Sequence, residues 1–349
     1  MLTRMWRRSK RPVIGLDIGP SSVKAIAIEQ AEDQFKVVAY GEAALTPQCL
    51  TPKEVKDSAV LVRAIQSACS SLPKKSFRVI MALSDDAVIS KTIPIYSLRA
   101  DDEIMAQVFL AASQAIAYPA ADLYCDYQII PSSSPDRLVT FVAARAQTIA
   151  AYHQAVSDAG FKLSVIDVES QVLAQTYHYF MPKNISASSV MAVLNIGLHR
   201  SLFVIINKTT TIYVRAETFS DEYITKKIFE LNPSLSMVSE LKHNNFLQDC
   251  QSETIGLFFQ VLGQQLKRHI QFFAMTNEYQ PIQQILITSD CVTPEGISTF
   301  LSQEIKLPIV ELNTFVNFNL PAQLDSSMLL QRASSWLFPC ALAIRGIIA

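Results

Sequence analysis

Runs and alternations of apolar residues divide the chain into short strands and amphipathic helices. Apolar or alternating stretches predict strands at 13–18, 23–28, 35–44, 78–83, 87–95, 122–130, 138–144, 162–168, 210–217, 284–288 and 309–312, and a hairpin of two strands at 190–206. Apolar residues at helical spacing predict helices at 58–71, 101–117, 147–159, 220–231, 236–248, 253–276, 294–305 and 334–347. This mixture of short strands and helices indicates an α/β protein.

The first two predicted strands are joined by a short polar turn, which consists of Gly19, Pro20, Ser21 and Ser22. The glycine allows a close backbone approach and the hydroxyls add to exposed N–H groups, so the turn can wrap a phosphate. Asp17 can hold a hydrated Mg²⁺ that the phosphate shares, and Lys24 supplies a cation nearby. A single such hairpin is equally consistent with an ordinary polar-tipped turn.

A second hairpin of the same kind follows about half a chain later. Its first strand again ends in a polar residue, Ile and Gly, and the matching polar positions are Asn195, Gly197 and Ser201, the serine one place further along than in the first turn. Two such hairpins indicate a duplicated fold whose halves face each other across a cleft. The pair resembles the two phosphate loops of the actin, Hsp70 and sugar-kinase architecture.

Composition agrees with two lobes and points neither to a nucleic-acid partner nor to a zinc site. The chain has 349 residues, of which 50% are hydrophobic, which suffices for two cores. The net charge of −1 gives no argument for a nucleic-acid partner. The six cysteines are scattered singly, without zinc-like spacing, and we expect reduced, buried thiols. The basic segment 1–11 is interpreted as a disordered leader, with weak attachment to an anionic membrane as the alternative.

Residues 87–163 are predicted to form an inserted β-α-β-β-α module. Actin-like proteins with an insertion at this point are the cell-division protein FtsA and the type IV pilus assembly protein PilM. The stretches that resemble the PilM family are 15–24, 118–127, 142–145, 158–160, 165–170 and 340–345. The similarity covers nearly the whole chain and is strongest in the first half. It implies an actin-like (ASKHA) duplicated two-lobe fold with an inserted α+β subdomain in the first lobe.

The resemblance, taken with the predicted elements, implies four subdomains. The first lobe comprises 12–86 plus 164–186 (1A), and the insertion comprises 87–163 (1C). The second lobe comprises 187–219 plus 281–349 (2A), with a helical subdomain at 220–280 (2B).

The resemblance also implies an ATP and Mg²⁺ site, from which this chain departs. Glu169 resembles the middle acidic position, whereas the third position is Asn195, which carries no charge. Two glycine pairs are replaced by 220–221 and 289–290, both Ser-Asp, which would crowd a purine and repel an anion. We expect nucleotide binding to be weakened or lost, with ATP bound in a shifted pose as the alternative. If it is retained, the site comprises Asp17 on Mg²⁺ with Gly19, Pro20, Ser21, Ser22, Lys24, Glu169, Asn195, Gly197, Ser201 and Ser289.

For function, the resemblance implies a cytoplasmic scaffold, peripheral to the inner membrane, in the alignment complex of the type IV pilus. It would bind the N-terminal cytoplasmic peptide of a PilN-like membrane protein and couple the pilus motor ATPases to that complex, without enzymatic activity beyond residual ATPase. The family's peptide groove lies between the first lobe and the inserted module, here near 81–95 and 104–130.

Two alternatives of other classes stay open. An actin-like ATPase or small-molecule kinase would use the cleft between the lobes, with Glu169 or Asp167 as the general base. A filament-forming protein resembling FtsA would carry a membrane-binding C-terminal helix, and residues 334–347 do not resemble one.

Overall fold

The computed structural model describes residues 12–31, 34–46, 48–51, 54–72, 78–95, 101–116, 118–130, 137–181, 190–197, 200–217, 252–276, 281–290, 295–322 and 325–348. Its first large sheet has the order β10-β6-β1-β2-β3-β16. The strands are β1 (Val13–Ile18), β2 (Ser22–Ala31), β3 (Gln34–Ala44), β6 (Arg78–Leu83), β10 (Lys162–Val168) and β16 (Phe318–Asn319). The β1-β2-β3 meander is antiparallel, and β6 and β10 continue the sheet in parallel with β1.

The second large sheet repeats this topology. Its order is β13-β12-β11-β14-β15, with strands β11 (Val190–Ile196), β12 (Ser201–Asn207), β13 (Thr210–Glu217), β14 (Gln284–Ser289) and β15 (Ile309–Glu311). Again an antiparallel meander is followed by two parallel strands. The two similar hairpins in the sequence therefore occupy equivalent places in two equivalent sheets, as a duplicated fold requires.

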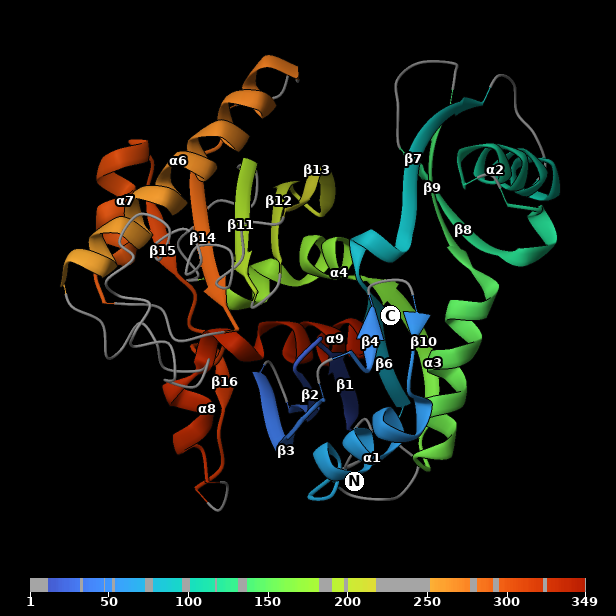
Figure 1. The fold of residues 1–349 in the computed structure, drawn as a ribbon, viewed down its shortest axis with the longest axis horizontal. Coiled ribbons are helices and arrows are strands. Elements are labelled where there is room, and N and C mark those ends of the chain that lie inside the picture. Colours follow the sequence, from blue (N-terminus) through green and yellow to red (C-terminus); the bar gives the residue numbers. More distant parts are fainter. Residues whose placement is uncertain are drawn as a thin grey trace, which may run out of the picture.

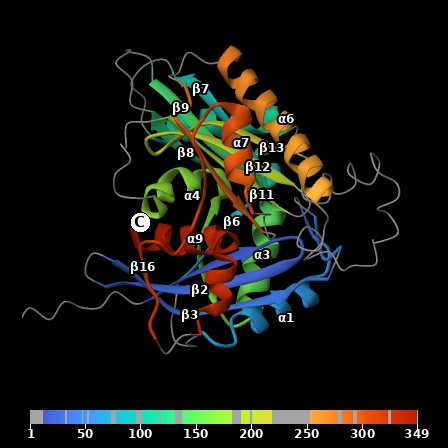
Figure 2. The ribbon, with the colours of Figure 1, turned by 90° about the vertical axis from the view of Figure 1, so that its left-hand side faces the viewer.

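The last helix joins the two lobes. α9 (Leu337–Ile348) lies between the two large sheets (Figures 1 and 2), packed against β1, β2, β6 and α4 (Glu169–Thr176). Its approach to β1 is very close, because a Cβ atom on Gly15 would lie 1.8 Å from the Pro339 carbonyl oxygen. Side chains of both sheets and of α9 form one continuous apolar core. This shared core holds the two lobes together.

Each sheet is covered on its other face by its own helices. α1 (Ser58–Ala68) and α3 (Ala146–Asp158) pack against the first sheet, and Asp57 caps α1 by accepting the Val60 N–H at 2.9 Å. α6 (Ser252–Thr276) and α7 (Ile297–Ile305) pack against the second sheet. The spacing of Phe258, Phe259, Phe272 and Phe273 in the sequence predicts that all four belong to the core of this lobe; Phe258, Phe259 and Phe273 do, whereas Phe272 is 46% exposed. Short elements complete the description: β4 (Leu50–Thr51), β5 (Glu54–Val55), α8 (Ser327–Gln331), and 3₁₀ turns at Asp85–Ala87, Ala120–Asp122, Tyr177–Phe180 and Ala333–Trp336.

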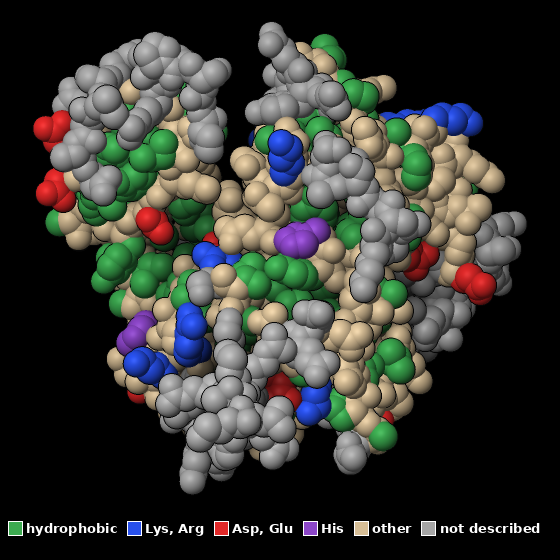
Figure 3. All heavy atoms as spheres, turned by 180° about the vertical axis from the view of Figure 1, so that it is seen from behind, with side chains coloured by type: hydrophobic (Ala, Val, Ile, Leu, Met, Phe, Trp, Pro, Cys, Tyr) green, Lys and Arg blue, Asp and Glu red, His purple; other side chains and the backbone are tan. Residues whose placement is uncertain are grey.

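The inserted module is a three-stranded antiparallel sheet with one helix. Its order is β7-β9-β8, with β7 (Val88–Ile95), β8 (Leu123–Ile130) and β9 (Arg137–Arg145). α2 (Asp101–Ile116) covers only one face, through a small core that includes Val108, Val139 and Phe141. Seen from behind, the module stands apart from the second lobe across an open notch (Figure 3).

Some predicted elements differ from the observed ones. The helix predicted at 334–347 starts as a 3₁₀ turn and becomes α-helical at Leu337, and Pro339 fits there because N–H groups of a first helical turn need no intrahelical partner. α7 starts at Ile297 rather than at 294. The helices predicted at 220–231 and 236–248, and the basic segment 1–11, lie outside the described residues. We keep the subdomain boundaries as a proposal, noting that α3 shares the core of the first lobe.

Candidate functional site

The two phosphate-loop-like turns have the same backbone geometry. The Gly19 N–H donates to the Ser22 carbonyl at 3.0 Å, and the Gly197 N–H donates to the Arg200 carbonyl at the same distance. Arg200 therefore occupies the place of Ser22 in the duplicate. Ser201, which the sequence suggested for this role, is instead the first residue of β12 and is fully buried.

Lys24 bridges the two lobes rather than lying free beside the first turn. It faces Asp17 across the β1–β2 ladder and is 3% exposed. Its Nζ donates to the Ser335 carbonyl at 3.1 Å and lies 3.6 Å from Oδ1 of Asp290, which follows β14. Pro20 and Ser21 at the tip of the turn are exposed.

Arg200 is paired with Glu169, the residue at the middle acidic position of the predicted nucleotide site. Its Nη2 donates to Oε2 of Glu169, and its Nη1 lies 3.8 Å from Oδ2 of Asp86. Glu169 is the first residue of α4, and this helix is anchored because Asp85 accepts hydrogen bonds from the N–H and Oγ of Ser170, at 3.1 and 2.5 Å. An ion pair thus joins the second turn to the start of α4.

Burial dominates the electrostatics of the two predicted acidic ligands. Burial raises the pKa of Asp17 to about 7, while the positive charges of Lys24 and Arg200 oppose the rise and Asp290 adds to it. Burial likewise raises the pKa of Glu169 to about 6, against the influence of Arg200. Both carboxyl groups therefore change charge close to neutral pH.

The remaining residues predicted for the cleft are buried in the second sheet or hydrogen-bonded to its strands. The Asn195 side chain is buried in β11, with 7% exposure. Ser289 Oγ donates to the Ile196 carbonyl at 3.1 Å, and the Asp290 N–H donates to the same oxygen at 3.1 Å. The first Ser-Asp pair, 220–221, lies outside the described residues.

This donor set does not fit a divalent cation held between the lobes. Glu169 is neutralised by Arg200 and Asp17 faces Lys24, so each acidic ligand already has a cation beside it. In the part of the chain that the structure describes, no group of three or more His, Cys, Asp or Glu side chains is arranged to hold a metal ion. Sequence reasoning missed Arg200, although its position in the turn, equivalent to Ser22, was a usable signal.

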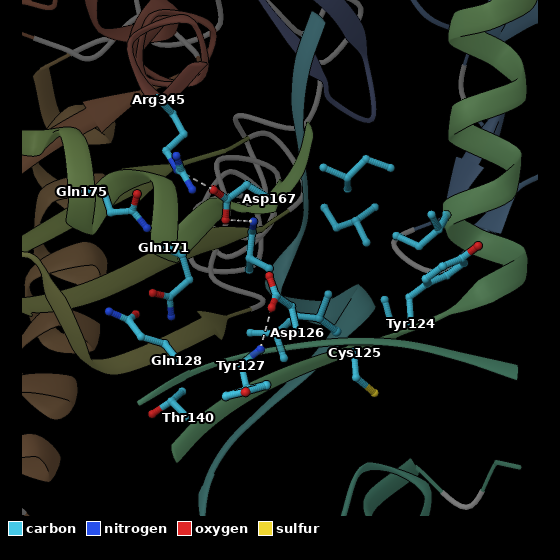
Figure 4. Close-up of a pocket in the computed structure, with 17 residues that line it drawn as sticks. Tyr124, Cys125, Asp126, Tyr127, Gln128, Thr140, Asp167, Gln171, Gln175 and Arg345 are labelled. Carbon is cyan, nitrogen blue, oxygen red and sulfur yellow. Dashed lines mark hydrogen bonds and ion pairs between the residues drawn. The ribbon is translucent and has the colours of Figure 1, made fainter. Parts of the chain in front are cut away.

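A second candidate site is a groove of about 570 Å³ between the inserted module and the first lobe (Figure 4). Its floor comes from β8 and β9, and its opposite wall comes from β10, α4 and α9. The lining residues are Leu83, Val88, Tyr124, Cys125, Asp126, Tyr127, Gln128, Thr140, Val142, Ala144, Ile149, Ile166, Asp167, Val168, Gln171, Gln175 and Arg345.

The groove exists because α2 leaves one face of the module's sheet uncovered. Cross-strand rows on the open face pair Tyr124 with Ala144, Asp126 with Val142 and Gln128 with Thr140. Residues between them, such as Phe141, point to the other face and are buried under α2. Tyr124 is 60% exposed, which is unusual for a large aromatic side chain at the edge of such a groove.

An ion pair lies on the opposite wall. Nε of Arg345, on α9, donates to Oδ2 of Asp167 at 2.9 Å, and Oδ1 of Asp167 accepts the Val168 N–H at 2.8 Å. Asp167, which was a candidate general base, is therefore engaged in a structural pair. The pair holds the end of β10 against the last helix.

Only part of the two ranges predicted for the peptide groove, 81–95 and 104–130, lines the observed groove. Residues Leu83, Val88 and 124–128 line it, whereas α2 takes 104–116 to the far face of the sheet. The sequence prediction missed the residues from β9, α4 and α9. They are separated from 81–130 by long stretches of chain and meet it only through the fold.

Comparison with known proteins places the chain in a family. The chain resembles a chain of the solved "PilM-PilN type IV pilus biogenesis complex", with 20% identity, coverage of 96% of this chain and 98% of that one, and a TM-score of 0.78. It also resembles the ethanolamine utilization protein EutJ from Carboxydothermus hydrogenoformans (11% identity, 96% and 90% coverage, TM-score 0.55).

A third similar structure is MreB 5 of Spiroplasma citri bound to AMPPNP (10% identity, 97% and 96% coverage, TM-score 0.51). At these identities the structures show the fold alone, and they confirm the actin-like architecture expected from the sequence. Among the described helices, none has both the length and the apolar character needed to cross a bilayer. The family model of the type IV pilus assembly protein PilM matches residues 15–347, so the chain belongs to this family.

Proposed function

We propose that the chain is a scaffold of the type IV pilus alignment complex and that it binds the N-terminal cytoplasmic segment of a PilN-like membrane protein. The observation that carries this proposal is the groove between the inserted module and the first lobe. Membership of the PilM family supports it, as does the structural similarity to a PilM–PilN complex. The protein would then be held at the cytoplasmic face of the inner membrane by its partner and would link that partner to the pilus motor ATPases.

The groove has the chemistry that an extended peptide needs. Apolar side chains such as Val88, Ala144 and Ile166 give pockets for apolar residues. Gln128, Gln171 and Gln175 each present both a donor and an acceptor, which suits hydrogen bonding to a peptide backbone. A segment that enters this groove would contact both the module and α4.

We further propose that the nucleotide site is degenerate. Lys24 and Arg200 are engaged in ion pairs with Asp290 and Glu169, so a nucleotide with its Mg²⁺ would have to break pairs before it could bind. If ATP is still bound, the residues predicted for it from the two turns, β14 and α4 remain the candidates. The actin-like fold would act as a rigid platform, and we assign no catalytic residue.

A substitution in the floor of the groove tests the partner proposal. Val142→Trp fills the groove with a neutral side chain, whereas Leu110→Trp alters an apolar residue of the same module, 59% exposed and outside the groove lining. The PilN-like protein should co-purify with the wild type and with Leu110→Trp but not with Val142→Trp. Equal recovery with all three proteins would refute the proposed site.

Calorimetric titration with Mg-ATP tests the nucleotide proposal separately. We expect no saturable binding at millimolar ATP. Saturable binding that Asp17→Ala abolishes would show that the first turn works as a phosphate loop and would overturn the proposed degeneracy.

A further inference from the structure

The groove carries one carboxylate that lacks a balancing charge. Asp167 is paired with Arg345 on the wall, at 2.9 Å. On the floor, Asp126 accepts the N–H of its neighbour Tyr127 at 2.8 Å, and no Lys or Arg among the described residues forms an ion pair with it. The described groove therefore has a net negative charge, located at Asp126.

Asp126 lies between two chemically different ends of the groove. On one side, Gln128, Thr140, Gln171 and Gln175 form an amide and hydroxyl end, and on the other side Tyr124 marks an apolar end (Figure 4). The cross-strand rows show the same order, because Asp126 and Val142 lie between the Gln128 row and the Tyr124 row. The lining follows β8 over 124–128 and β9 over 140–144, so the groove runs along the strands.

A ligand that covers Asp126 removes water from its carboxylate. Losing hydration without gaining a partner is costly for an ionised group, and a cation on the ligand offsets this cost best because it both hydrogen-bonds and neutralises the carboxylate. In an extended chain, residues two apart lie on the same side, about 6.6 Å from each other, which matches the spacing of successive rows along β8. The geometry of the groove thus fixes where along a bound segment that charge must lie.

We infer that Asp126 selects a partner segment that places a cationic group over the middle of the groove, two residues from an apolar side chain that fills the end near Tyr124. This inference rests on the proposed function, since it names the chemistry of the segment bound there. The cation is either a Lys or Arg side chain or the α-ammonium group of the segment. Glutamines at the other end then hydrogen-bond the backbone.

The test uses the full-length protein and a fluorescent synthetic peptide with the N-terminal cytoplasmic sequence of the PilN-like protein of the same organism. Fluorescence anisotropy gives the dissociation constant for the wild type, Asp126→Asn and the matched control Asp122→Asn, an exposed carboxylate just before β8 and outside the groove lining. We expect Asp126→Asn to weaken binding by about tenfold or more and Asp122→Asn by less than about twofold. Asparagine keeps an oxygen that can accept the Tyr127 N–H, and equal melting temperatures would show intact folding.

Peptide variants identify the cation. If a basic side chain provides it, replacing that residue by Gln should weaken binding to the wild type and not to Asp126→Asn. If the α-ammonium provides it, N-acetylation should have this effect instead. Tight binding that Asp126→Asn leaves within about twofold would overturn the inference while leaving the proposed function intact. No binding of the peptide to the wild type would overturn the proposed function itself.

Discussion

The replacement Arg200→Gln removes the positive charge that neutralises Glu169 between the lobes. The side chains of Arg200 and Glu169 are only 25% and 18% exposed, so the pair is largely shielded from water. Removing one partner of a fully buried pair costs about 3–5 kcal/mol, because the other charge stays buried and unpaired. Since some water reaches both groups here, we expect a loss of about 2–3 kcal/mol in the free energy of unfolding at pH 8.

The loss should depend on pH with a definite sign. Burial raises the pKa of Glu169 to about 6, so the folded state binds this proton more tightly than the unfolded chain does. Without Arg200, which opposes the rise, the pKa of Glu169 should move higher still. At pH 5 Glu169 is mostly protonated in both folded proteins, so the difference between them should shrink to less than about 1 kcal/mol.

Urea denaturation followed by circular dichroism at pH 8 and pH 5 measures both values. Arg63→Gln, which changes an exposed arginine on α1, serves as the control and should lose less than about 0.5 kcal/mol. The double variant Arg200→Gln/Glu169→Gln should regain more than half of the loss at pH 8, because no buried charge remains. A loss below about 0.5 kcal/mol at pH 8, or equal losses at both pH values, would refute the reasoning.

Two further predictions concern the first hairpin and its contact with α9. Burial raises the pKa of Asp17 to about 7, so protonation of its carboxyl stabilises the fold at low pH and this stabilisation is lost as the pH rises from about 4 through 7. Asp17→Asn should therefore raise the free energy of unfolding at pH 8 by about 1–3 kcal/mol and leave it nearly unchanged at pH 4, and a destabilised variant at pH 8 would contradict this. Gly15→Ala should destabilise by about 3 kcal/mol or more in the same assay, since its Cβ would overlap the Pro339 carbonyl. Gly256→Ala, in α6 with no atom within 4 Å of its Cβ, should instead stabilise by about 0.5–1 kcal/mol, and similar effects of the two substitutions would show that α9 does not pack as described.

The sequence predicted the repeated hairpins well because their information is local. The strands at 78–83 and 162–168 match β6 and β10 at both ends, and the glycine of each turn occupies the place expected. Apolar runs bounded by polar turns specify such strands directly. The alternating stretch 122–130 likewise predicted β8.

The ion pairs could not be predicted in this way, because they depend on contacts between distant segments. Arg200 reaches Glu169, 31 residues earlier, and Arg345 reaches Asp167, 178 residues earlier. The sequence comparison of the two turns was also one residue out of register, so it selected Ser201, which is buried, instead of Arg200. The wall of the groove was missed for the same reason, since α4 and α9 meet the module only in the folded chain.

Site-specific photo-crosslinking from the groove tests the central claim most directly. Benzoylphenylalanine replaces either Tyr124, which lines the groove, or Tyr118, an exposed tyrosine outside the groove lining that packs against Arg145. With the PilN-like protein present, we predict cross-links to its N-terminal cytoplasmic segment from position 124 and none from position 118. Cross-links to that segment from position 118 alone, or from neither position despite co-purification, would contradict binding in the groove.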